Sequence, residues 1–359
     1  MPTYWSGISG YKPHLTVSAY GTALGAPVAN NGADYGPDTS TTSTSGIQEA
    51  INAAASSGNR SVYLINDGRN FNINTQLLFQ SYVSVVSNGA TLLNNSALQY
   101  PFATPNNSDF YRAEILGLVL NGNGVSNCQC LTLNSPQRSV VDVFIRNALY
   151  GCAILVQTSG TPIESVLGNN ATLNRFRFQF DNIVNNETAG AVALSLQGNG
   201  TLPTVVTDNR FEQVSATNVY GIGIQLVEWA DSNDFGTVLV SLAPNSSSNP
   251  TNTPTGVILN NLSPYNTNVG VYNNRFAKLS VDAFGFPKTY TGVTGILFNY
   301  TYQNVVSQFI TSPGPTPGVF PGTRYDFNLS ASHFFRDMYN STTSTSGTTH
   351  VLNMPSVSP

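Results

Sequence analysis

The residues best suited to chemistry gather in one short stretch, the heptapeptide EWADSND at residues 228–234. The whole chain holds only 18 acidic residues, so this concentration stands out. Cleavage of a sugar chain commonly needs two carboxylates about 5 to 9 Å apart, and an aromatic ring can stack on the apolar face of a sugar. Glu228, Asp231 and Asp234 are therefore candidate catalytic residues, and Trp229 is a candidate carbohydrate-binding residue.

Two residues upstream extend this set. Glu212 lies in the preceding segment and is a fourth candidate catalytic residue, while Tyr220 leads into the strand before the heptapeptide and is a second candidate carbohydrate-binding residue. A structural interpretation stays open, because Asp favours turns, where its carboxylate accepts backbone hydrogen bonds. On that interpretation Asp231 and Asp234 are turn residues and only Glu228 and its neighbouring Trp are left for chemistry.

Other chemistry has little support in the sequence. Asp181 and Glu187 form a second pair of acids. The three His residues lie far apart, and no acidic cluster denser than residues 228–234 exists, so we expect neither a metal site nor a cofactor.

Cys128, Cys130 and Cys152 cannot all pair within one chain, because their number is odd. Two alternatives remain. The thiols are simply buried, or Cys130 and Cys152 stack in adjacent turns of a repeating fold and form a disulfide.

A short helix is expected to begin the folded part of the chain. Ile47, Ala50, Ile51 and Ala54 share one helical face, so the pattern predicts an amphipathic helix over residues 47–55. Ser45 with Gln48 three residues later has the spacing of a capping box, and Gly58 is a natural stop. Apolar residues then alternate in the strand period, at Val62 and Leu64, Phe71 and Ile73, and Val83 and Val85.

Two phrases recur after these strands. One begins with Gly and continues with apolar residues, starting at Gly151, Gly190, Gly221, Gly256 and Gly295. The other is Asn-x-Phe, starting at Asn174, Asn209, Asn233 and Asn274. Fixed phrases with variable gaps are typical of a solenoid, in which Asn residues at the bends can form hydrogen-bonded ladders. A jelly roll or sandwich is the alternative, but phrases repeated in one order favour the solenoid.

The segment 32–95 resembles the N-terminal signature of the pectate-lyase-like right-handed β-helix superfamily, which includes polysaccharide-degrading enzymes and viral tailspikes. The matching residues are the GADYG turn at 32–36, the helix, Val62-Tyr63-Leu64, Gly68 and the GATL sequence at 89–92. Ile65 replaces the usual Pro, and the Asp/Thr segment is longer than usual. The resemblance covers roughly residues 32–300 and implies an all-β fold, a right-handed single-stranded parallel β-helix with a short N-terminal α-helical cap.

Charge is sparse, with 14 Lys and Arg, 18 Asp and Glu, and a net charge of -4. Binding of nucleic acid needs clustered cations, so we expect no nucleic-acid partner. No stretch is long and apolar enough to span a membrane, and no signal peptide is visible. A polar but uncharged surface suits a virion or secreted protein and should change little in acid.

The sequence divides into a leader at 1–31, a β-helix at 32–310, and a Pro/Gly loop, Ser/Thr linker and tail at 311–359. Together with the resemblance, this predicts a virion tailspike or fibre, a homotrimer that binds host polysaccharide or glycoprotein glycans and attaches through its leader to a tail or baseplate protein. Whether it also cleaves glycans stays open. A secreted glycoside hydrolase or polysaccharide lyase is the alternative, and a structural surface protein is a further one. Asn199 and Asn245 head loop sequons and are candidate glycosylation sites.

Overall fold

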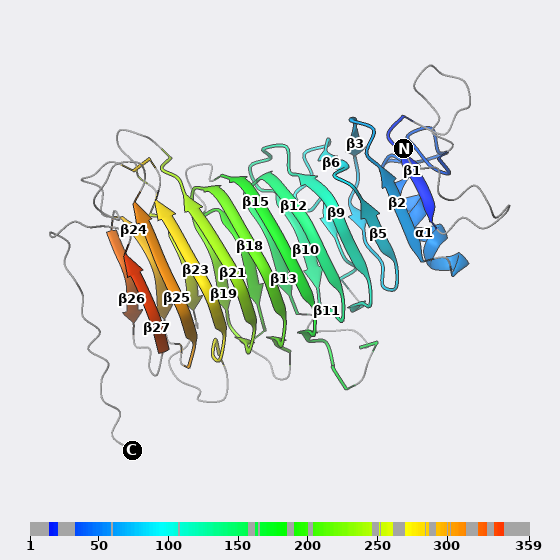
Figure 1. Ribbon diagram of the computed structural model, residues 1–359. Helices are drawn as coiled ribbons and strands as arrows, with labels where there is room; N and C mark the ends of the chain where they lie inside the picture. Colours follow the sequence, from blue (N-terminus) through cyan, green and yellow to red (C-terminus); the bar gives the residue numbers. More distant parts are fainter. Residues whose placement is uncertain are drawn as a thin grey trace.

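The chain is seen in a computed structural model (Figure 1). The structure describes residues 14–20, 33–58, 60–106, 108–156, 162–163, 166–184, 190–199, 204–245, 251, 253–260, 270–283, 285–286, 292–299, 301, 303–313, 322–328 and 334–340.

Three parallel sheets make up the fold. Sheet A comprises β1 (Leu15–Ser18), β2 (Ser61–Ile65), β5 (Ser84–Ser87), β9 (Glu114–Asn121), β12 (Val140–Ala148), β15 (Arg175–Ile183), β18 (Arg210–Val219), β21 (Asp234–Leu242), β23 (Arg275–Ala283), β25 (Val305–Pro313) and β27 (Phe334–Asn340), with β3 (Asn70–Ile73) and β6 (Thr91–Asn94) beside them. Sheet B comprises β4 (Leu77–Leu78), β7 (Phe102–Ala103), β10 (Gln129–Asn134), β13 (Tyr150–Leu155), β16 (Val192–Gln197), β19 (Ile222–Val227), β22 (Thr255–Asn260), β24 (Val293–Asn299) and β26 (Gly322–Asn328). Sheet C comprises β8 (Phe110–Tyr111), β11 (Pro136–Gln137), β14 (Ala171–Thr172), β17 (Val206–Thr207) and β20 (Ala230–Asp231).

The chain visits the sheets in a fixed order. In the central coils it runs from sheet C to sheet A to sheet B, as in β14, β15 and β16, and then rises one strand to repeat the circuit as β17, β18 and β19. Each of these three strands pairs in parallel with its equivalent in the next coil. The result is the expected right-handed parallel β-helix, drawn in Figure 1 as a stack of coils from the blue to the red end.

Aromatic rings fill the interior as a column. Phe176, Phe211, Phe235 and Phe276 are fully buried and stand at equivalent positions of β15, β18, β21 and β23. The ring centroids of Phe211 and Phe235 are 4.4 Å apart, and those of Phe235 and Phe276 are 4.5 Å apart. These spacings match the distance between neighbouring strands, about 4.8 Å, so each coil buries its ring against the next.

The Asn residues of the recurring phrase form the expected ladder at the corner between sheets C and A. The side-chain amide of Asn174 donates to Oδ1 of Asn209 at 2.8 Å, Asn209 donates to Asn233 at 3.0 Å, and Asn233 donates to Asn274 at 3.0 Å. Asn274 donates in turn to Asn304, which continues the ladder although no Phe follows it at the same spacing.

The predicted helix is present as α1 (Ile47–Ser57), and its four apolar residues are buried. It packs against β1, β2 and β4 at the N-terminal end of the stack. Gly58 ends it in the left-handed conformation, as expected, with φ of 75°. The predicted cap at Ser45 is wrong: Gly46 occupies the N-cap position, while Ser45 donates from its hydroxyl to the carbonyl of Asn72.

The sheets extend past both boundaries expected from the sequence. Residues 15–18 of the predicted leader form β1, which pairs with β2. At the other end β25 runs to Pro313, and β26 and β27 add further strands beyond residue 310. Strand pairing there is set by the coil beneath, so a weak sequence pattern is enough to continue the stack.

The three Cys residues are buried, and none forms a disulfide. Cys152 pairs in register with Leu131 and not with Cys130, so the predicted alternative of a bond between Cys130 and Cys152 is not realised. Burial raises the pKa of the Cys130 and Cys152 thiols well above the usual range, which keeps both of them protonated and unreactive.

Candidate functional site

A hollow of about 270 Å³ lies along the solvent-facing side of sheet B, across β10, β13, β16 and β19. Its lining consists of Gln129, Tyr150, Cys152, Ala153, Leu155, Val192, Ser195, Gln197, Gln225 and Val227. The hollow therefore draws one or more side chains from each of four successive coils.

Parallel register sets these side chains in rows that run along the β-helix axis. Ala153, Ser195 and Gln225 occupy one row, because β13, β16 and β19 pair residue for residue at that position. Neighbouring strands in such a sheet are about 4.8 Å apart, so equivalent groups from successive coils present themselves at nearly constant spacing.

The lining of the hollow is polar without being charged. Gln197 is exposed, Tyr150, Ser195 and Gln225 are half-buried, and none of the described lining residues is an acid or a base, while the Cys152 thiol stays protonated. Amides and hydroxyls can both donate and accept hydrogen bonds, and the aliphatic and aromatic members offer contact to C–H groups. This arrangement can bind a polyhydroxylated molecule, and its described residues include no carboxylate for acid–base chemistry.

Glu228 and Trp229 lie directly beyond this hollow, in the turn that leaves β19. Both residues have positive φ, 37° and 48°, which marks a tight corner. Glu228 is half-buried, whereas the side chain of Trp229 is covered, with the residue 8% exposed. The corner packs closely against the preceding coil: a Cβ on Gly198 would lie 2.4 Å from Cβ of Trp229.

Asp231 lies on sheet C, where it is 7% exposed. Its Oδ1 accepts a hydrogen bond of 2.5 Å from the hydroxyl of Thr207, its neighbour in register. Burial raises the pKa of Asp231 and the nearby charge of Asp208 adds to this, while hydrogen bonds from Thr207, Tyr272 and Ser232 act in the opposite direction. Asp208 had no special signal in the sequence, and only the stacking of coils brings it near Asp231.

Asp234 begins the next strand, β21 on sheet A, and is exposed. It stands in a row between Arg210 and Arg275. Glu228, Asp231 and Asp234 thus occupy three successive segments of one coil: a corner, sheet C and sheet A.

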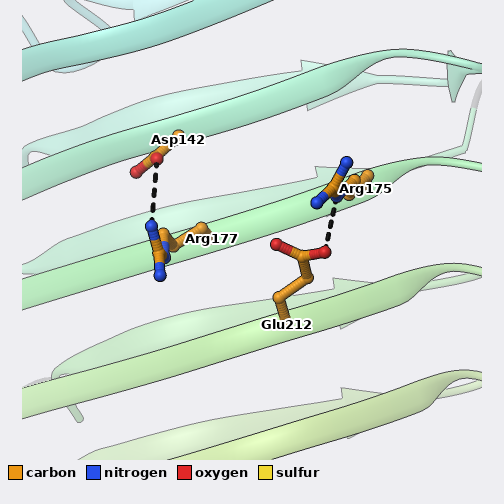
Figure 2. A network of polar contacts seen from close by, with 4 residues as sticks. All are labelled: Asp142, Arg175, Arg177 and Glu212. Atoms are coloured by element: carbon orange, nitrogen blue, oxygen red, sulfur yellow. Dashed lines mark hydrogen bonds and ion pairs between the residues drawn. The ribbon is translucent and has the colours of Figure 1, made fainter.

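Glu212 belongs to a polar network on the outer face of sheet A (Figure 2). Its Oε1 is 2.5 Å from Nε of Arg175 on the neighbouring strand, and Arg177 lies 3.8 Å from Asp142. The hydrogen bond from Arg175 lowers the pKa of Glu212, so this carboxyl stays ionised and is unsuited to donating a proton. Burial raises the pKa of Asp142.

The remaining predicted residues are dispersed. Tyr220 is half-buried at the end of β18. Asp181 accepts hydrogen bonds from Thr217 and Asn218 on the next coil, while Glu187 lies outside the described residues.

The two candidate glycosylation sites lie in connections beyond strands. Asn199 is half-buried just after β16, and Asn245 is exposed and hydrogen-bonded to Thr251.

No cluster of three or more metal-binding side chains occurs in the part of the chain that the structure describes. Within the same residues no helix is long and apolar enough to cross a membrane.

Comparison with known proteins identifies the fold. No protein-family profile and no curated protein matches the sequence. A mutant tailspike protein of E. coli bacteriophage HK620, solved in complex with a pentasaccharide, aligns over 92% of this chain and 64% of its own, with 13% identity and a TM-score of 0.50. A second mutant of that tailspike aligns over 95% and 67%, with 14% identity and a TM-score of 0.52.

A bacterial surface adhesin, PfbA of Streptococcus pneumoniae, aligns over 82% of this chain and 94% of its own, with 11% identity and a TM-score of 0.37.

The two tailspike alignments show that the architecture is a parallel β-helix similar to that of a phage tailspike. The chain spans 64% of the length of the pentasaccharide-bound tailspike. Membership of the pectate-lyase-like superfamily stays a prediction, since no family profile matches.

Proposed function

We propose that this protein recognises glycans on a cell surface, as a tailspike or fibre of a virion. The observation that carries the proposal is the uncharged polar hollow on sheet B, which offers amides, a serine hydroxyl and a tyrosine from consecutive coils. Sugars present hydroxyls and C–H faces in alternation, and this combination of groups matches both.

The fold supports the same proposal. The similar solved structures include a tailspike protein bound to a pentasaccharide, and a long rigid solenoid presents an extended face to a partner. On this proposal the partner is a host polysaccharide or glycoprotein glycan, and the protein lies on the virion surface or, as a secreted protein, outside the cell. It assembles as a homotrimer and attaches to a tail or baseplate protein through residues 1–31.

A retention experiment tests the binding function. Purified protein is applied to arrays of extracted surface polysaccharides, alongside the variants Gln197→Ala and Gln225→Ala. Binding that weakens in both variants supports the proposal. Absence of retention on every polysaccharide contradicts it and leaves a structural surface protein. Native mass measurement tests the proposed homotrimer, and a monomer at micromolar concentration would contradict it.

A second candidate function is glycan cleavage. Asp231 favours it, because its pKa is raised and a second acid, Asp208, lies near enough for its charge to contribute to that rise. Glycoside cleavage usually requires a pair of carboxyl groups. Glu228, Asp234 and Glu212 remain further candidates. Defined oligosaccharide products that disappear in Asp231→Asn, with binding retained, would support cleavage. Products that persist in that variant would exclude Asp231.

Asn245 is the better of the two proposed glycosylation sites, because it is exposed whereas Asn199 is half-buried. Mass spectrometry of the virion or secreted protein tests both sites. An unmodified Asn245 in protein from a glycosylating host would count against the proposal.

A further inference from the structure

We propose that the hollow on sheet B takes an electrically neutral glycan laid along the axis of the β-helix, one sugar after another across successive strands. This inference rests on the proposed glycan-binding function and adds to it the class of sugar and its direction on the protein.

The neutrality of the ligand follows from where the charges lie. Among the residues that the structure describes, no cationic side chain lines the hollow. Three arginines of the central coils instead open strands of sheet A, at Arg175, Arg210 and Arg275. A carboxylate or sulfate brought into the hollow would give up hydration without meeting a cation, which is costly, and the net charge of -4 adds a weak repulsion.

The direction of the ligand follows from the register. Tyr150 on β13, Ser195 on β16 and Gln225 on β19 each reach the hollow from a different coil. A glycan that ran along a single strand would meet the side chains of one coil. A glycan that runs across the strands meets a hydrogen-bonding or stacking group in each coil, and this is how the hollow distributes its polar groups.

The apolar residues of the lining narrow the class of sugar that the hollow would bind. Leu155, Val192 and Val227 lie among the amides and the hydroxyl, and apolar area gains from covering methyl groups as well as C–H faces. Neutral sugars that carry methyl groups, such as N-acetylated and 6-deoxy sugars, therefore fit better than plain hexoses.

Affinity electrophoresis tests neutrality. The probes are galactomannan, laminarin and N-acetylated chitin oligosaccharides as neutral glycans, and polygalacturonate, alginate and polysialic acid as acidic ones, each at low and high salt. We expect retardation by neutral probes only, without salt dependence, and about 3- to 10-fold weaker binding in Gln197→Ala and Gln225→Ala, as for loss of one hydrogen bond. Gln179→Ala on sheet A is the matched control and should bind normally.

The outcomes separate the two proposals. Retardation by acidic probes that fades with salt overturns neutrality but leaves glycan recognition standing. If neutral probes retard both Gln variants as strongly as the wild type, the hollow on sheet B is not the binding site. If no probe retards the protein, this inference is contradicted. If the protein also binds nothing on the arrays of surface polysaccharides, the proposed glycan-binding function is contradicted as well.

A length series tests direction. Fragments of increasing length from the retained glycan are titrated against Tyr150→Ala, Ser195→Ala and Gln225→Ala. If the glycan lies along the axis, the shortest fragment is sensitive to one or two of these substitutions and longer fragments become sensitive to all three. Sensitivity of long fragments confined to a single coil would overturn the proposed direction.

Discussion

A single buried Asn in each of five successive coils, from Asn174 to Asn304, holds the corner between sheets C and A. The side chain of Asn209 makes contacts above and below: its amide nitrogen donates to the carbonyl of Ala171 at 2.9 Å and to Asn233, while its Oδ1 accepts from Asn174. The residue is 1% exposed, so water cannot replace a lost partner. The ladder therefore combines turn geometry with satisfaction of buried polar groups.

Asn209→Ala should lower the free energy of unfolding by about 2 to 3 kcal/mol, because it leaves buried donors and acceptors without partners. Urea denaturation of the variant measures this loss. Asn72→Ala is the control, since Asn72 is exposed on β3 and should cost little. Equal stability of the two variants would show that the ladder contributes nothing.

Asp231 should make stability fall as pH rises. Its folded-state pKa is raised, chiefly by burial, so the folded protein holds a proton that the unfolded chain releases at about pH 3.9. The contribution of this carboxyl is complete below that pH and is lost as pH rises through the higher folded pKa. Urea denaturation of wild type and Asp231→Asn between pH 3 and pH 7 should show the variant gaining relative to wild type toward pH 7. A constant difference would contradict the assignment.

At the scale of elements, sheets A and B approach closely, because Gly151, Gly223 and Gly256 on sheet B have no side chain where they face sheet A. A Cβ on Gly223 would lie 2.5 Å from Cγ1 of Val240 on sheet A and 2.5 Å from the carbonyl oxygen of Gly256 in the next coil. Gly151 meets the ring of Phe180 in the same way, at 2.6 Å. These glycines therefore lie at positions where a side chain would collide with the facing strand.

Gly223→Ala should destabilise the protein by about 1 to 3 kcal/mol, as overpacking of a filled core does. Gly190→Ala is the matched control, because its Cβ would meet nothing within 4 Å. This control should be neutral or gain up to about 1 kcal/mol from the stiffer unfolded chain. Thermal or urea unfolding of both variants checks the pair, and similar losses in both would refute the close approach.

At the scale of the molecule, charge is sparse and unevenly placed. The chain has 18 acids among 359 residues, and in the described part the arginine–carboxylate pairs lie on the outer face of sheet A. Burial raises the pKa of Asp109, Asp142 and Asp231, so these groups favour the folded state in acid. Glu212, whose pKa is lowered, acts in the opposite sense.

We therefore expect the urea midpoint at pH 3 to stay close to that at pH 7. In acid Glu212 loses its ion pair with Arg175, and the raised pKa values of Asp109, Asp142 and Asp231 offset this loss. Denaturation curves at pH 7, 5 and 3 measure this, with heat-induced unfolding as a second probe. A collapse of the midpoint between pH 7 and pH 3 would show that ionised carboxylates hold the fold together.

The sequence by itself determined the architecture, because each coil repeats the same local demands. The spacing of Ile47, Ala50 and Ile51 is enough for the helix, and the Asn-x-Phe and Gly phrases indicate the ladder and, in several coils, the close approach of sheets A and B. Ser45 was misassigned because Asn72, remote in sequence, offers its hydroxyl another partner.

Only the tertiary structure decided the site. The hollow takes Gln129, Tyr150, Ser195 and Gln225 from four strands separated by loops of unequal length, so no spacing along the chain reveals it. Outward-facing Gln residues such as Gln197 in the Gly phrases were the one local signal. Conversely, the acids close together in the sequence at 228–234 are distributed over a corner, sheet C and sheet A. The reason is that the chain passes from one sheet to the next within a few residues of a coil.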